Sequence, residues 1–313
     1  MDNKDIKILY MGTPEFAVNA LKSIIDAGYN VIGCYTQPDK SQGRSKKLVP
    51  SPVKEAALEA GIPVFQPVKL REEENVSAIR EMNPDIIVVA AYGQILPKSI
   101  LDIPKYGCVN IHASLLPKYR GAAPIEWSVI NGEKETGVTT MFMAEGLDTG
   151  DIIEKSVTAI GEKETAEELR KRLAEMGAEL IISTISKLIS GEVDRTPQDD
   201  SKSNYAVRLS KEMGRVNWAL PAENIERLIR GLQPWPVVYT ELNQKSLKIY
   251  EADVVNDING TPGEIVEVGK KYFTVACGKG GLKILKVQPE GKKMMDTVAF
   301  LNGNKLEAGM KME

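Results

Sequence analysis

Short apolar runs alternate with amphipathic helical segments through residues 7–131, and this rhythm restricts the fold more than any other feature of the sequence. The run at 86–92 is apolar on both faces, which is typical of a strand that is covered on two sides. Similar runs lie at 7–11, 30–37 and 107–113, with helical patterns between them. Strands and helices that alternate in this way form parallel sheets, so we expect an α/β fold with a doubly wound, mostly parallel sheet.

Two local patterns give more detailed expectations. The residues GTPE (12–15) form a typical helix start, with Thr13 as the expected N-cap and Pro14 at the first helical position. This helix is expected to end at Gly28, because glycine readily adopts the left-handed conformation that terminates helices.

Near the other end of the sequence, Trp235 lies between two prolines and is expected to pack in the core.

The pattern changes after residue 131. Two longer strand-like runs, 136–144 and 151–160, are joined by a Gly-rich connection, which favours an antiparallel extension of the sheet. A long amphipathic helix then ends at Gly191, a polar stretch follows, and short strand-like runs near the end suit a small β-barrel. The predicted organisation is a first domain at 1–190, a linker at 191–208 and a barrel domain at 209–313.

Composition and motifs disfavour several classes of protein. The net charge of -3 gives no global case for binding nucleic acid or a membrane. The sequence lacks the GxGxxG fingerprint after its first strand, so NAD and FAD are not expected, and it also lacks a P-loop. Three isolated cysteines and one histidine supply no set of metal ligands. The charged N-terminus leads straight into a strand and the longest apolar run is too short to span a bilayer, so we expect a reduced, cytoplasmic protein.

The single histidine, His112, lies two residues after Asn110 at the carboxyl end of a predicted strand. In an extended chain the two side chains face the same side, and ligands of parallel α/β sheets bind at this edge. An amide that donates to an oxyanion and an imidazole that accepts a proton suit acyl transfer. The alternative is a core histidine with satisfied hydrogen bonds, beside an asparagine that closes a loop.

Two further segments carry candidate site residues. The connection at 145–151 offers Asp148 and Asp151 between glycines, either of which can orient the imidazole, although aspartate is also common in simple turns. No additional acidic cluster supports a cation site there. The loop at 37–54 carries several cations and suits a phosphate-rich ligand, with a solvated surface loop as the alternative. Residues 205–313 hold 16 lysines and arginines against 13 acidic residues, which permits polyanion binding without requiring it.

Together, five segments of this sequence resemble the bacterial methionyl-tRNA formyltransferases. The resemblance covers essentially the whole chain. The segments are NIHASLLPKYRGAAPI (110–125), LDTGD (147–151), MGTPEFAV (11–18), QPDKSQGRSKKLVPSPVK (37–54) and AAYGQILP (90–97).

The resemblance implies a Rossmann-like catalytic domain, a linker and an OB-like β-barrel that binds tRNA. It implies transfer of a formyl group from 10-formyltetrahydrofolate to the methionine amino group of initiator methionyl-tRNA, for translation initiation, without a metal. By position in the matching motifs, it assigns catalysis to Asn110, His112 and Asp148, folate binding to Ser114, Leu115, Leu116, Pro117, Ala91, Tyr92 and Gly93, and tRNA binding to Arg44, Lys46 and Lys47.

Two rival functions stay open at this point. One is a folate-dependent formyltransferase that acts on a small amine, such as glycinamide ribonucleotide or an amino sugar nucleotide. A small acceptor, however, needs neither the tail domain nor the basic loop. The other is a folate-binding or RNA-binding protein without catalysis, which has no need of a base. Nothing in the sequence requires more than a monomer.

Overall fold

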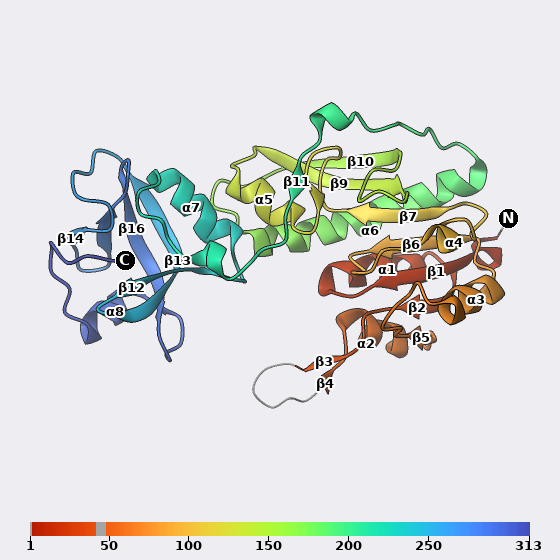
Figure 1. The fold of residues 1–313 in the computed structure, drawn as a ribbon, viewed down its shortest axis with the longest axis horizontal. Coiled ribbons are helices and arrows are strands. Elements are labelled where there is room, and N and C mark those ends of the chain that lie inside the picture. Colours follow the sequence, from red (N-terminus) through yellow and green to blue (C-terminus); the bar gives the residue numbers. More distant parts are fainter. Residues whose placement is uncertain (1, 42–47) are drawn as a thin grey trace. The chain divides into compact units, whose positions relative to one another are not determined.

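The computed structural model describes residues 2–41 and 48–313. Over these residues the chain divides into two compact units. The first comprises residues 1–121, 135–159 and 170–206, and the second comprises residues 122–134, 160–169 and 207–313. Figure 1 labels helices and strands of both units.

The first unit is built on a sheet in which seven strands pair, among the described residues, in the order β10-β9-β7-β6-β1-β2-β5. The five strands from β7 to β5 are parallel, and β9 and β10 extend the sheet antiparallel at one edge. This confirms the α/β fold and its antiparallel extension. The strands are β1 (Lys7–Gly12), β2 (Asn30–Tyr35), β5 (Val64–Phe65), β6 (Ile86–Ala90), β7 (Cys108–His112), β9 (Glu135–Phe142) and β10 (Ile152–Ala159).

Helices pack against this sheet, and every residue of β6 is buried, as its apolar pattern predicts. The long helix α6 approaches β7 and β9 closely at Gly177, where a Cβ atom would lie 2.9 Å from Cγ2 of Ile111 and 3.5 Å from Cγ1 of Val138. A larger residue at 177 would therefore push the helix away from the sheet. The helices are α1 (Val18–Asp26), α2 (Pro52–Glu59), α3 (Glu73–Met82), α4 (Lys98–Leu101) and α6 (Ala166–Ser190).

The start of the first helix differs from the expectation. A short 3-10 turn at Glu15–Ala17 precedes α1, and its N-cap is Pro14, so the prediction of Thr13 as N-cap was wrong. The Thr13 hydroxyl donates instead to the carbonyl of Tyr92 at 2.9 Å and accepts from the backbone N–H of Gln37 at 3.3 Å. Thr13 thus joins the loops that follow β1, β2 and β6. The predicted end of the helix is correct, since Gly28 has a φ of +81°.

The second unit contains the antiparallel sheet β12-β13-β16-β15-β14, with β17 paired to β16. Its core includes Ile225 and Ile229 of the amphipathic helix α7. The final residues bridge the two edges of the sheet, because Met312 pairs with Leu242 and Lys311 pairs with Glu264. The elements are α5 (Pro124–Ile130), α7 (Ala222–Gly231), β12 (Val238–Leu242), β13 (Lys245–Val255), β14 (Ile265–Val268), β15 (Phe273–Ala276), β16 (Gly281–Pro289), β17 (Met295–Asp296) and α8 (Thr297–Gly303).

Trp235 corrects a second expectation, because it does not pack in the core. Its side chain is 55% exposed, whereas Leu232, Val237 and Val238 are buried. Pro234 and Pro236 on either side fix the backbone, and the turn places the smaller aliphatic side chains inward in place of the indole.

The three cysteines, Cys34, Cys108 and Cys277, are buried and unpaired. Burial raises the pKa of each thiol to about 12, so the thiols stay protonated near neutral pH and none supplies a thiolate nucleophile. Within 2–41 and 48–313, no group of three or more His, Cys, Asp or Glu side chains could hold a metal ion. In the same residues no helix combines the length and apolarity needed to cross a membrane.

Candidate active site

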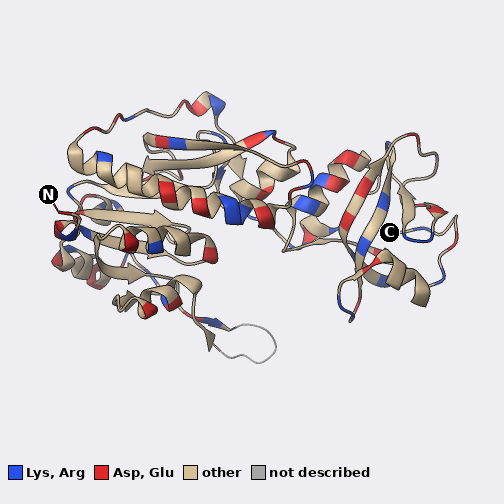
Figure 2. Ribbon diagram, turned by 180° about the vertical axis from the view of Figure 1, so that it is seen from behind, with Lys and Arg blue, Asp and Glu red and all other residues tan. Residues whose placement is uncertain are grey.

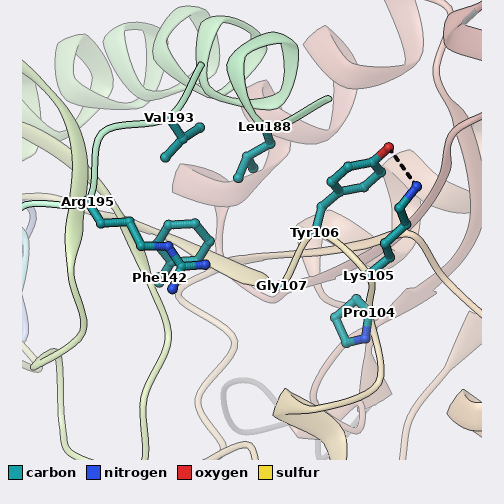
Figure 3. Close-up of a pocket in the computed structure, with 8 residues that line it drawn as sticks. All are labelled: Pro104, Lys105, Tyr106, Gly107, Phe142, Leu188, Val193 and Arg195. Carbon is teal, nitrogen blue, oxygen red and sulfur yellow. Dashed lines mark hydrogen bonds between the residues drawn. The ribbon is translucent and has the colours of Figure 1, made fainter. Parts of the chain in front are cut away.

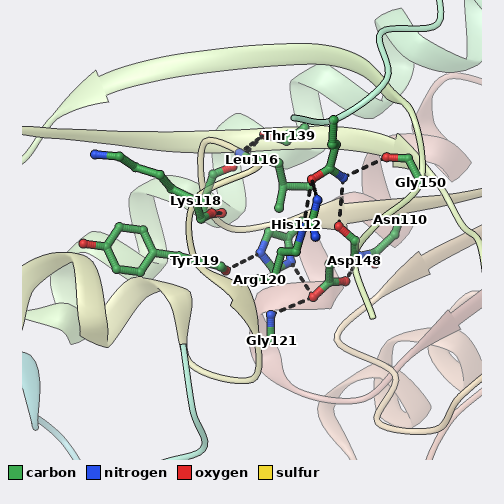
Figure 4. A network of polar contacts seen from close by, with 12 residues as sticks. Asn110, His112, Leu116, Lys118, Tyr119, Arg120, Gly121, Thr139, Asp148 and Gly150 are labelled. Atoms are coloured by element: carbon green, nitrogen blue, oxygen red, sulfur yellow. Dashed lines mark hydrogen bonds and ion pairs between the residues drawn. The ribbon is translucent and has the colours of Figure 1, made fainter. Parts of the chain in front are cut away.

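Asn110, His112 and Asp148 meet at the carboxyl edge of the parallel sheet (Figure 4). Asn110 and His112 belong to β7, and Asp148 belongs to the connection between β9 and β10. The Asp148 Oδ1 atom lies 3.5 Å from Nδ2 of Asn110, and Oδ2 lies 3.7 Å from Nδ1 of His112. The side chains of His112 and Asp148 are only 6% and 13% exposed, so water screens the Asp148 carboxylate from the imidazole only weakly.

The backbone carbonyl of Tyr119 determines which imidazole nitrogen carries hydrogen. His112 Nε2 lies 2.8 Å from this oxygen. A carbonyl oxygen only accepts hydrogen bonds, so Nε2 is the donor and the neutral ring keeps its lone pair on Nδ1. The nitrogen that can accept a proton therefore faces Asp148.

Asp148 is held in place by backbone groups as well as by its neighbours. Its Oδ2 accepts a hydrogen bond of 2.8 Å from the N–H of Gly121. Asp148 itself has a φ of +51°, a left-handed conformation that is uncommon for residues other than glycine. The tight turn between Gly146 and Gly150 thus aims the carboxylate at the imidazole. The other candidate, Asp151, contributes its backbone carbonyl to the hairpin by accepting from Phe142 N–H.

A buried threonine fixes the loop that follows His112. The Thr139 hydroxyl donates to the carbonyl of Ser114 at 2.6 Å and accepts from the N–H of Leu116 at 3.2 Å. The Ser114 hydroxyl donates to the carbonyl of Lys118 at 2.7 Å. Leu116 is fully buried with Met141 and Ile152, so its side chain forms core. Of the four residues expected at 114–117, Ser114 and Leu116 thus give the loop its shape.

The segment 91–93 has left-handed backbone on both sides of a buried tyrosine. Ala91 and Gly93 have φ values of +47° and +90°, and both are exposed. The Tyr92 side chain is buried, which raises its pKa, and its carbonyl accepts from Thr13 Oγ1 and from Gln37 Nε2. The exposed residues of this segment are therefore the small ones, Ala91 and Gly93.

Several residues at the site carry no signal in the sequence. The stretch 196–206, interpreted as part of a linker, hydrogen-bonds to both loops that flank His112. Gln198 Nε2 donates to the carbonyls of Asp148 and Gly150, at 2.8 and 2.7 Å. Asn204 Oδ1 accepts from the N–H of Tyr119 at 2.5 Å. These contacts span about 50 to 85 positions of sequence, which no local pattern reveals.

The predicted tRNA contacts Arg44, Lys46 and Lys47 lie outside the described residues. The described flanks of the same loop pair as β3 (Lys40–Ser41) and β4 (Leu48–Val49). At its base, Lys54 forms an ion pair of 2.7 Å with Asp39, and this hydrogen-bonded ion pair lowers the pKa of the Asp39 carboxyl group.

A pocket of about 370 Å³ lies away from these residues (Figure 3). It is lined by side chains that include Tyr106, Phe142 and Leu188, and the guanidinium of Arg195 stacks over Phe142 at 3.8 Å. None of the residues that line it belongs to the candidate site.

Comparisons with known proteins give the family of the chain. The formyl transferase family model matches residues 4–185, and the model of the formyl transferase C-terminal domain matches residues 208–305. A methionyl-tRNA formyltransferase of Lachnospira eligens is 50% identical over 311 residues, with 97% of this chain and 99% of the relative covered. Another from Geobacter sulfurreducens is 50% identical over 307 residues, with 98% and 96% covered.

Solved structures share the fold at lower identity. The N-formyltransferase from Helicobacter canadensis, in complex with folinic acid and dTDP-3-aminofucose, has a TM-score of 0.68 at 21% identity, covering 91% of this chain and 99% of that one. A sugar 3N-formyl transferase in the presence of dTDP and 5-N-formyl-THF has a TM-score of 0.67 at 23% identity, covering 92% and 99%. Its close relatives and both matching family models show that the chain belongs to the methionyl-tRNA formyltransferase family and is a formyltransferase.

Proposed function

We propose that the protein transfers the formyl group of 10-formyltetrahydrofolate to the methionine amino group of initiator methionyl-tRNA, in the cytoplasm, as a monomer. The observation that carries this proposal is the cluster of Asn110, His112 and Asp148 at the ligand-binding edge of the sheet, in a chain 50% identical to methionyl-tRNA formyltransferases. Donor, acid–base group and orienting carboxylate are the parts that formyl transfer requires.

The residues at this edge fit a flat, polar folate ring beside the catalytic groups. Ala91 and Gly93 are small and exposed, so a ring can approach their backbone. The fixed loop at 114–117 forms a neighbouring wall, because Thr139 holds it by two hydrogen bonds. We assign folate binding to Ala91, Tyr92 and Gly93 through the backbone, and to the 114–117 loop.

In the proposed reaction, the methionyl amine attacks the formyl carbon. As the new N–C bond forms, His112 Nδ1 accepts a proton from the amine, and Asp148 stabilises the resulting imidazolium. Asn110 Nδ2 donates a hydrogen bond to the oxyanion that develops on the formyl oxygen.

Collapse of the tetrahedral centre breaks the bond between the formyl carbon and the folate nitrogen. His112 returns its proton to that nitrogen as it leaves. Protons and electron pairs balance over the cycle, and the chain ends in its starting state. Tyr119 keeps Nε2 protonated throughout, so Nδ1 carries both transfers.

The acceptor is assigned to the second unit and to the basic loop. Figure 2 shows lysines and arginines along β13 and β16 of the second unit, interspersed with acidic residues. Lys248 and Lys283 each lie between two buried positions of their strands, so they lie on the outer face of the sheet. We assign backbone contacts of tRNA to this unit and to Arg44, Lys46 and Lys47 of the loop.

Replacing Thr139 by valine should raise KM for 10-formyltetrahydrofolate by roughly five- to tenfold and lower the free energy of unfolding by about 1–3 kcal/mol. Valine has nearly the same shape but leaves the carbonyl of Ser114 and the N–H of Leu116 buried without this partner. Steady-state kinetics and urea unfolding measure both effects. Thr139→Ser keeps the hydroxyl and is the matched control, and a valine variant with unchanged KM and stability would contradict the assignment.

Acceptor competition tests the function against formylation of a small amine. Purified protein is given 10-formyltetrahydrofolate with methionyl initiator tRNA, glycinamide ribonucleotide or an amino sugar nucleotide, at several salt concentrations. We expect transfer to the tRNA alone, with a KM that rises steeply with salt because cations of the protein contact phosphates. Faster transfer to a small amine, with little salt dependence, would overturn the proposal.

A further inference from the structure

We propose that residues 196–206, here named the crossing segment, position the two groups that face the ring nitrogens of His112, and that Gln198 and Asn204 are positioning residues for catalysis. The inference rests on the proposed function, since it concerns how the catalytic imidazole is held. One partner of His112 is the Tyr119 carbonyl at Nε2, and the other is the Asp148 carboxylate at Nδ1. The crossing segment contacts the backbone of both partners.

Gln198 fixes the turn that carries Asp148. Its Nε2 donates to the carbonyls of Asp148 and Gly150, one on each side of Thr149. The left-handed conformation of Asp148 costs conformational energy and persists only where its surroundings hold it. Two hydrogen bonds from a single amide hold this turn, so Gln198 determines where the Asp148 carboxylate points.

Asn204 fixes the other partner in the same way. Tyr119 also has a left-handed backbone, with a φ of +61°. Its N–H donates to Asn204 Oδ1, and the N–H of the next residue, Arg120, donates to the Asn204 carbonyl at 3.0 Å. Parallel pairing of β11 (Tyr205–Ala206) with β8 (Arg120–Gly121) continues this contact. These contacts of Asn204 determine the direction of the Tyr119 carbonyl. They therefore also determine the tautomer of His112.

Arg120 contacts both Gln198 and Asn204, and it determines the orientation of the Gln198 amide. Its buried guanidinium donates to Gln198 Oε1 from Nε and Nη2, at 3.0 and 2.9 Å, and Nη2 also contacts Asp200 at 2.8 Å. The amide oxygen must face this cation, and the amide nitrogen must face the two carbonyls. The reverse orientation would place the NH₂ donors against the guanidinium and the amide oxygen against the carbonyl oxygens. Gln198 therefore acts through its N–H donors and Asn204 through its oxygen acceptor.

This difference gives a test with two nearly isosteric substitutions that add the same charge. Gln198→Glu places a carboxylate oxygen against the carbonyls of Asp148 and Gly150, whereas Asn204→Asp keeps an oxygen for the Tyr119 N–H. We expect Gln198→Glu to lower kcat by about ten- to a hundredfold, with KM for donor and methionyl-tRNA within about twofold of wild type. Asn204→Asp should keep kcat within about threefold.

A third variant, Asn204→Ala, removes the acceptor without adding charge and should lower kcat by about tenfold, with restoration in Asn204→Asp. It tests the inference independently if Gln198→Glu does not fold, as judged by circular dichroism. Equal kcat values for Gln198→Glu and Asn204→Asp, or a wild-type kcat for Asn204→Ala, would overturn the inference. Lack of formylation by wild-type protein in the same assay would overturn the proposed function itself.

Discussion

His112→Ala should lower kcat for formyl transfer by roughly 10²- to 10⁴-fold, the range that a positioned general base contributes. His112 is the only histidine in the chain, and the pairing of Nε2 with Tyr119 leaves Nδ1 to accept the proton of the amine. Rapid-quench measurement of formylmethionine on the tRNA reports the chemical step.

Binding of the two substrates should change little in the same variant, because the imidazole is almost fully buried and faces Asp148. Affinity for methionyl-tRNA, measured by filter binding, is the control. Equal losses in turnover and in tRNA affinity would show that His112 supports the structure of the binding surface, which is the core-histidine alternative.

Asn110→Ala should lower kcat by roughly 10²- to 10³-fold, which corresponds to about 3–4 kcal/mol of barrier, the effect of losing one oxyanion donor. Asn110 Nδ2 lies beside the Asp148 carboxylate, at the end of the strand that also carries His112. In the proposed mechanism this amide N–H donates to the oxyanion.

Asn110→Asp is a second test, because it keeps the shape of the side chain and removes its N–H donor. A second carboxylate near Asp148 also opposes an oxyanion, so its kcat should fall at least as far as that of Asn110→Ala. The same single-turnover assay measures both variants. An aspartate variant with nearly wild-type kcat would show that position 110 does not act as an oxyanion donor.

The fold of the first unit could be predicted because its signals are local. A strand that is apolar on both faces, such as β6, needs helices on both sides, and the alternation of elements dictates parallel pairing. The prediction of a helix start at Thr13 was wrong because tertiary contacts, and not local signals, determine what Thr13 does. Its hydroxyl forms tertiary hydrogen bonds with two other loops, and these replace the expected cap. The prediction for Trp235 was also wrong. The flanking prolines fix its backbone, and its side chain stays exposed although it is hydrophobic.

The candidate site could be predicted in part. Asn110 and His112 share a face of one strand. The connection at 145–151 offered Asp148 and Asp151, the resemblance selected Asp148, and the structure brings Asp148 beside the other two. The groups that hold these three come from elsewhere. Thr139 belongs to a neighbouring strand, and Gln198 and Asn204 lie in a polar stretch that has no periodic pattern. Such contacts depend on how distant segments cross, so they require the structure.

Formylation of the natural acceptor tests the central claim most directly. Wild-type protein and His112→Ala are incubated side by side with 10-formyltetrahydrofolate and methionyl initiator tRNA, and formylmethionine released from the tRNA is quantified. We predict stoichiometric formylation by the wild type and almost none by the variant in the same time. Absence of product from folded, folate-binding wild-type protein, or equal product from the variant, would contradict the claim that this histidine carries formyl transfer to methionyl-tRNA.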